Sequence, residues 1–136
     1  MNTTWIILGA TSSMARAFAR KAAGQGAAVL LAGRDIEDLT AMAEDCRLRG
    51  ARLAEAVHFD AREPAGFPAL IARMETEEGE LNAAVFVGSM PAQSEIDADP
   101  ALIDGVVQDS HTGPARFLQM LAPLQEARGG GTVVGV

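Results

Sequence analysis

Tyrosine is absent from the 136 residues of the chain, and Lys21 is its only lysine. A mechanism that needs a catalytic tyrosine, or a tyrosine beside a lysine, therefore cannot be completed within this chain. Cys46 is the only cysteine, which excludes an internal disulfide and a cysteine-rich zinc site. We expect Cys46 to be a small buried residue on the apolar face of a helix rather than a nucleophile.

Positive charge is also scarce, because 11 basic residues stand against 18 acidic residues and the formal net charge is -7. Without a cluster of Lys and Arg to follow a phosphate backbone, we expect no nucleic-acid partner. The longest apolar stretches, such as Trp5 to Ala10, fall far short of the roughly 20 residues that cross a membrane, so we expect no membrane partner. The start of the chain lacks the positive charges of a secretory signal, which predicts a cytoplasmic protein.

Apolar residues make up 49% of the chain, enough for one domain with a single core, which we place at residues 1–136. Short apolar runs alternate with stretches of helical periodicity. We expect strands at 5–8, 28–32, 56–59, 83–87 and 132–134. We expect helices at 13–23, 36–50, from 64 into the acidic run 75–80, and 100–127, the last bent or broken at Gly113-Pro114 and Pro123. The alternation predicts an α/β fold, a Rossmann-like, doubly wound parallel sheet of five strands in the order 3-2-1-4-5.

The turn after the first strand is the most informative segment of the chain. Ile6 to Leu8 lead through Gly9 into small and hydroxyl-bearing residues and then into a helix. Such a turn directs backbone N–H groups and the positive end of the helix at a diphosphate. The candidate binding residues here are Gly9, Thr11, Ser12, Ser13 and Met14. The alternative is a helix N-cap beside a tight turn that binds no ligand.

This turn resembles that of the short-chain dehydrogenase/reductase family, which reads T-G-x-x-x-G-x-G. Gly9 stands at the first glycine, Ser13 at the second and Ala15 at the third, and the sequence is closer still to a branch of the family that reads G-A-T-S-x-I-A. The resemblance extends over essentially the whole chain. It implies an oxidoreductase that transfers hydride between a nicotinamide cofactor and a small carbonyl or alcohol substrate.

The end of the second strand bears on the choice of cofactor. Arg34 lies about 20 residues beyond the first turn, where a dinucleotide site places the residue that contacts the ribose 2′ position. An acidic residue there would accept from a free 2′-hydroxyl, whereas the Arg34 guanidinium can bind a 2′-phosphate through two hydrogen bonds. NADP(H) is therefore favoured, and NAD(H) remains possible. The alternative is a solvated Arg34 that Asp35, a candidate helix N-cap, partly neutralises.

The resemblance implies further site residues. Asp60 would accept from the adenine amino group and Ala61 would leave room for the ring, although Asp60 could instead cap the next helix. Gly88 would lie beside the cofactor ribose, in an irregular loop at 88–99. Ser110 stands where the family carries an asparagine that supports a proton-relay water, and it is the one catalytic candidate. We expect no metal site, because His58 and His111 lie far apart without other ligands at metal spacing.

The family's catalytic serine and its Y-x-x-x-K pattern follow the fifth strand and would lie beyond Val136. We therefore expect this chain to be the cofactor-binding part of a longer enzyme and to be inactive alone. The last strand has an apolar edge that a continuation of the chain or a partner subunit should cover. The resemblance implies a homo-oligomer. A non-catalytic module that binds or senses NADP(H) is the alternative, indicated by the absent tyrosine and by Ser110.

Overall fold

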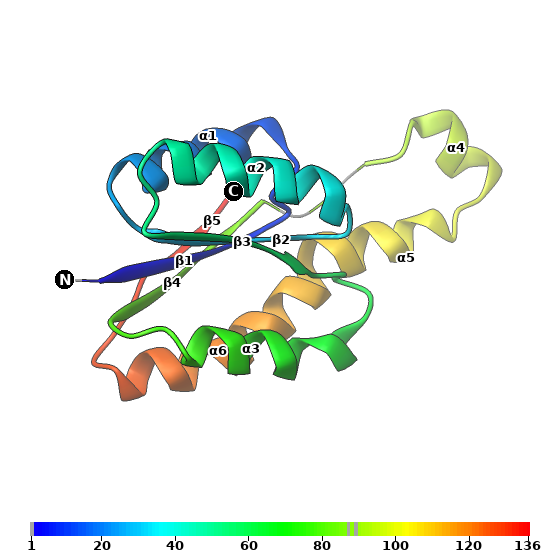
Figure 1. Cartoon of the computed structure of the whole chain (residues 1–136). Helices are drawn as coiled ribbons and strands as arrows, with labels where there is room; N and C mark the ends of the chain where they lie inside the picture. Colours follow the sequence, from blue (N-terminus) through cyan, green and yellow to red (C-terminus); the bar gives the residue numbers. More distant parts are fainter. Residues whose placement is uncertain (1, 87, 89) are drawn as a thin grey trace.

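The computed structural model describes residues 2–86, 88 and 90–136. They form a five-stranded parallel sheet in the order β3-β2-β1-β4-β5, which confirms the predicted fold. Helices α1 and α2 cover one face of the sheet, and α3 and α6 cover the other (Figure 1). The strands are β1 (Thr3–Leu8), β2 (Ala28–Gly33), β3 (Leu53–His58), β4 (Glu80–Val85) and β5 (Val133–Gly135). The helices are α1 (Ser13–Gly24), α2 (Ile36–Leu48), α3 (Phe67–Glu75), α4 (Gln93–Ala98), α5 (Leu102–Val107) and α6 (Gly113–Ala127).

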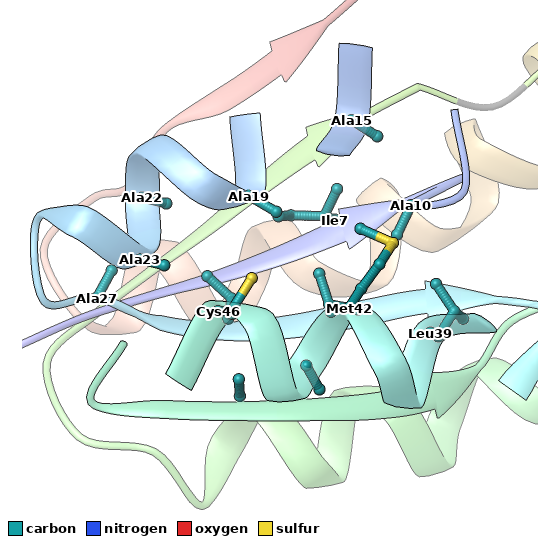
Figure 2. Close-up of a cluster of buried hydrophobic side chains, with 14 residues drawn as sticks. Ile7, Ala10, Ala15, Ala19, Ala22, Ala23, Ala27, Leu39, Met42 and Cys46 are labelled. Atoms are coloured by element: carbon teal, nitrogen blue, oxygen red, sulfur yellow. The ribbon is translucent and has the colours of Figure 1, made fainter. Parts of the chain in front are cut away.

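The sheet separates two hydrophobic cores because successive side chains of a strand point to opposite faces. On one side, Ile7 of β1 packs with small residues of α1 and with Met42 and Cys46 of α2 (Figure 2). The buried residues of α1 are all alanines, namely Ala15, Ala19, Ala22 and Ala23, and each is at most 5% exposed. Their small size lets α1 lie close against β1. Cys46 is buried as predicted.

The opposite core is built around three stacked and edge-on aromatic rings. The centroids of Phe59 and Phe67 lie 5.2 Å apart, and Phe117 of α6 meets these two rings edge-on at 5.8 and 5.7 Å. Such pairs add roughly 0.5–1.5 kcal/mol beyond the burial of their surface. They hold α3 and α6 together beneath the sheet.

Strands β1, β3 and β4 begin two or three residues earlier than predicted, and β5 begins one residue later. β3 begins at Leu53. The prediction missed this start because the charged Glu55 interrupts the apolar pattern of the strand. In the structure, Glu55 lies at the sheet edge and forms an ion pair with Arg73 at 2.8 Å. β4 begins at Glu80, and the buried Asn82 within it accepts from the Thr132 N–H at 2.7 Å, where the chain enters β5. Val87, the last position of the predicted fourth strand, and Ser89 of the predicted loop lie outside the described residues.

The helical segments after β4 also differ from the prediction. The expected loop at 88–99 contains the short helix α4, which buries none of its residues and which the sequence therefore did not indicate. The expected helix at 100–127 consists of α5, a π-helical turn at Gln108–Thr112, and α6. Gly113 donates its N–H to the carbonyl of Gln108, five residues back, so the π turn accommodates Pro114 and the helix continues. The expected boundary at Gly113-Pro114 coincides with the change from the π turn to α6, whereas α6 continues through Pro123 without a break.

The segment after β3 shows a smaller difference. A 3-10 turn at Pro64–Gly66 precedes α3, which ends at Glu75, the first residue of the acidic run. Across residues 2–86, 88 and 90–136, no helix has both the length and the apolar character to span a membrane.

Candidate functional site

A cleft of about 250 Å³ lies at the carboxyl ends of the strands, where open α/β sheets bind their ligands. Seven of the predicted residues line it: Gly9, Thr11, Ser12, Arg34, Asp60, Ala61 and Gly88. The other lining residues are Gly33, Phe59, Phe86 and Asp109. A larger, open hollow of about 700 Å³ lies between Glu78–Glu80 and Arg128–Thr132, at the amino ends of β4 and β5. None of the predicted residues lines that hollow, so the candidate site is the smaller cleft.

The turn after β1 is shaped by its backbone. Gly9 has a φ of 75°, a left-handed conformation that favours glycine, and its N–H and that of Ala10 donate to the Ala32 carbonyl at 3.0 and 3.2 Å. Ser12 is the N-cap of α1, and its Oγ accepts from the Ala15 N–H at 3.1 Å. In the described part of the chain, the N–H groups of Ser13 and Met14 have no hydrogen-bond acceptor. These first-turn N–H groups are available to an anion.

Ser13 and Met14 themselves do not line the cleft. Both are exposed at the first turn of α1, and the Met14 side chain is 57% exposed. The structure therefore offers their backbone rather than their side chains. The N-cap interpretation of the turn is correct for the Ser12 hydroxyl, and it leaves these two N–H groups unpaired.

Arg34 follows β2 at the rim of the cleft and is exposed. Among the described residues, no carboxylate lies within salt-bridge distance of its guanidinium. The adjacent Asp35 is the N-cap of α2, as predicted, and accepts from the Asp38 N–H at 3.1 Å. Asp35 therefore forms a cap rather than an ion pair with Arg34.

Asp38 is also occupied, through an ion pair that joins the two helices above the sheet. Its carboxylate pairs with Arg16 of α1, and the Arg16 Nε donates to the Thr11 carbonyl at 3.1 Å. The start of α2 is thereby tied to the turn after β1. Asp35 and Asp38 are thus engaged, and among the described residues Glu37 also forms no ion pair with Arg34, so the Arg34 charge remains for an anionic ligand.

The turn after β3 carries Asp60 and Ala61. The Asp60 Oδ1 accepts from the Arg62 N–H at 2.9 Å, so this carboxylate shapes its own turn. It does not cap a helix, because the following 3-10 turn starts at Pro64 without a side-chain cap. In the described ranges, the Asp60 Oδ2 has no hydrogen-bond partner, so this oxygen is left to accept from a ligand.

Ala61 touches the helix on the other side of the cleft, at a residue whose role sequence analysis missed. A Cβ placed on Gly113 would lie 2.4 Å from the Ala61 carbonyl oxygen and 2.6 Å from its Cβ. Gly113 therefore permits backbone contact between α6 and the turn after β3. Sequence analysis did not indicate this contact, because Ala61 and Gly113 lie 52 positions apart.

Ser110 lies against Gly88 in the π-helical turn. A Cβ on Gly88, which has a φ of 126°, would lie 2.7 Å from the Ser110 Oγ. Ser110 is exposed and does not line the cleft, whereas its neighbour Asp109 does. Asp109 forms two hydrogen bonds of 2.9 Å with the Arg62 guanidinium, and these raise the pKa of Arg62. Sequence analysis missed both residues, because nothing local indicates a pair that joins positions so far apart.

No group of three or more His, Cys, Asp or Glu side chains that could hold a metal ion occurs in the part of the chain that the structure describes. The groups at the cleft are those of an anion-binding site. They are the free backbone N–H groups at the start of α1, the Arg34 guanidinium, and the Asp60 Oδ2 beside the small side chain of Ala61. The strand order and this cleft define a Rossmann nucleotide-binding fold.

Comparison with known proteins identifies the family. The model of the short chain dehydrogenase family matches residues 3–136, and the chain belongs to this family. A curated relative from Mycobacterium tuberculosis, named only as an uncharacterized oxidoreductase, is 28% identical over 130 residues. That match covers 95% of this chain and 52% of the relative, so the chain spans about half the length of the curated relatives it matches.

Solved structures agree on the fold. An L-sorbose reductase from Gluconobacter frateurii, in complex with NADPH and L-sorbose, has a TM-score of 0.87 at 21% identity. The match covers 98% of this chain and 51% of that one. The actinorhodin polyketide ketoreductase with NADPH has a TM-score of 0.83 at 25% identity, over 98% of this chain and 52% of that one.

Proposed function

We propose that this chain is the cofactor-binding part of an NADP(H)-dependent oxidoreductase that acts on a small carbonyl or alcohol substrate. The observation that carries the proposal is the unpaired Arg34 guanidinium at the rim of the cleft, with Asp35 and Asp38 both engaged elsewhere. The NADPH bound to the ketoreductase and to the L-sorbose reductase supports the same cofactor here.

The residues present fit this cofactor. The N–H groups of Ser13 and Met14 would bind the diphosphate at the start of α1, beside Gly9, Thr11 and Ser12. Arg34 would bind the 2′-phosphate, and a carboxylate at this position, which would favour NAD(H), is lacking.

The adenine and ribose contacts complete the proposed assignment. Asp60 would accept from the adenine amino group through its Oδ2, Ala61 would face the ring, and Gly88 would lie near the ribose. When bound, the nicotinamide supplies or accepts the hydride. The protein residues named here bind and orient the cofactor.

The chain does not itself complete the catalytic apparatus that the proposed reaction needs, because it contains no tyrosine to serve as the general acid and base. We propose that residues 1–136 form one domain of a cytoplasmic, oligomeric enzyme whose sequence continues past Val136. Ser110 is the single catalytic candidate in this part.

The second candidate function is a non-catalytic module that binds NADP(H). The position of Ser110 favours it, because Ser110 lies outside the cleft lining and against Gly88. Reading the coding sequence past the codon for Val136 separates the two functions. A Y-x-x-x-K pattern downstream would eliminate the module, and a stop codon would favour it.

Calorimetric titration with NADPH and NADH tests the cofactor assignment. Arg34→Ala should weaken NADPH binding by about 10- to 100-fold and leave NADH binding nearly unchanged, because charge-assisted hydrogen bonds contribute roughly 1.5–3 kcal/mol. Lys21→Ala, which removes the same charge from the last turn of α1, is the matched control. Failure of the protein to bind either dinucleotide, or equal binding that Arg34→Ala does not change, would refute the assignment.

A further inference from the structure

The ion pair between Arg62 and Asp109 joins the two walls of the cleft beside Asp60 and Ala61, where the proposed function places the adenine. Arg62 belongs to the turn after β3 and Asp109 to the π-helical turn before α6. The Arg62 Nε and Nη2 donate to the two carboxylate oxygens of Asp109, each at 2.9 Å. This two-point geometry fixes orientation as well as distance, unlike a single flexible contact.

The burial of the two partners is unequal. The Asp109 side chain is only 14% exposed and lines the cleft, whereas the Arg62 side chain is 48% exposed. A carboxylate that is largely removed from water needs a partner. Without Arg62, the Asp109 charge would face a site that we propose to bind an anionic dinucleotide, and it would repel that ligand.

Two glycines of the facing helices make the contact possible. A Cβ on Gly105 would lie 2.5 Å from the Arg62 Nη2 and 2.9 Å from its Cζ, so the guanidinium rests on bare helix backbone. Gly113 contacts Ala61 in the same way. The turn that carries Asp60 is therefore held by this helical segment at two points, at Ala61 by shape and at Arg62 by charge.

We propose that the Arg62–Asp109 pair positions the turn after β3 so that Asp60 meets the 6-amino group of adenine. The inference rests on the proposed function. Arg62 and Asp109 act through Asp60 and are positioning residues. Because the Arg62 N–H already donates to the Asp60 Oδ1, a displacement of Arg62 moves the carboxylate that reads the base.

The test compares NADPH with its hypoxanthine analogue, in which a carbonyl replaces the 6-amino group of adenine. The protein should bind NADPH more tightly, because Asp60 accepts from the amino group and repels the carbonyl. Arg62→Gln should weaken NADPH binding by roughly tenfold and bring the affinities for the two dinucleotides closer together. A loss of fold stability alone would not change their ratio.

Further variants make the result specific. Arg49→Gln is the matched control, because Arg49 is 47% exposed and forms a 2.8 Å ion pair with Asp45 on α2, away from the cleft. Arg62→Lys keeps the charge and loses the two-point geometry. Its ratio of affinities for the two dinucleotides should therefore lie between the ratios of the unsubstituted protein and of Arg62→Gln. The exchanged pair Arg62→Asp with Asp109→Arg should recover part of the ratio.

The outcomes separate this inference from the proposed function. If the unsubstituted protein binds neither dinucleotide, the proposed function fails and the inference fails with it. If the unsubstituted protein binds NADPH, and both Arg62→Gln and Arg62→Lys keep its affinity and its ratio, the positioning role alone is refuted. An equal loss of affinity in Arg62→Gln and Arg49→Gln would also overturn it.

Discussion

The contact between Gly113 and Ala61 gives a quantitative prediction for Gly113→Ala. The added methyl group would lie 2.4, 2.6 and 2.8 Å from the carbonyl oxygen, Cβ and Cα of Ala61, well inside normal contact. Overpacking of this kind costs about 1–3 kcal/mol. Gly113 has helical dihedrals, φ -61° and ψ -57°, so alanine returns about 1 kcal/mol through helix propensity. We expect a net loss of up to about 2 kcal/mol and a decrease in Tm of up to roughly 8 °C.

Urea and thermal unfolding measure this loss, and calorimetric titration with NADPH measures its effect on the cleft. Gly24→Ala is the matched control, because α1 ends at Gly24 and a Cβ there has no described atom within 4 Å. That variant should be as stable as the protein or more so. Because the strained contact is with Ala61, Gly113→Ala should also weaken NADPH binding at temperatures where it is fully folded. Unchanged stability and unchanged affinity would show that the contact does not position the turn.

Two further predictions concern α1 and α2. Ser12→Ala removes the N-cap hydrogen bond of α1 and should lower the free energy of unfolding by about 1 kcal/mol. Ser13→Ala is the control, because Ser13 is exposed, and it should change the free energy of unfolding little. Equal values for the two variants in urea unfolding would refute the capping role of Ser12. Burial raises the pKa of the Cys46 thiol, so iodoacetamide should label it in the unfolded protein and hardly at all in the folded one. Because burial holds the pKa of the thiol in the folded protein above its ordinary value of 9.0, the stability that the neutral thiol contributes is complete below pH 9.0 and is lost as the pH rises through the folded pKa. Cys46→Ala should remove this dependence in unfolding measured from about pH 8 to about pH 10.5.

The parts of the fold that the sequence predicted are those in which local pattern and tertiary environment agree. The run from Trp5 to Leu8 is apolar and lies at the centre of the sheet, so its pattern and its burial coincide. The turn at Gly9 has the composition that its left-handed backbone requires. Asp35 was predicted as an N-cap because a cap depends on residues within one turn of helix.

The parts that the sequence missed depend on distant partners. The start of β3 was hidden by Glu55, whose charge is compatible with an edge strand once Arg73 pairs with it. The role of Gly113 depends on backbone 52 positions away, at Ala61. Arg62 and Asp109 are ordinary surface residues in sequence, and only the folded chain brings them to one end of the cleft.

The buried alanines of α1 have a consequence for the orientation of the N–H groups at the start of the helix. The two unpaired N–H groups at the start of α1 have no side-chain substitute, so their aim is set by the tilt of the whole helix. That tilt is fixed by methyl groups at Ala19, Ala22 and Ala23, which lie up to three turns from the cleft. A larger residue at one of these positions would push that end of α1 away from the sheet and change the direction of the N–H groups at the other end. The proposed phosphate binding would therefore depend partly on buried alanines that do not line the cleft.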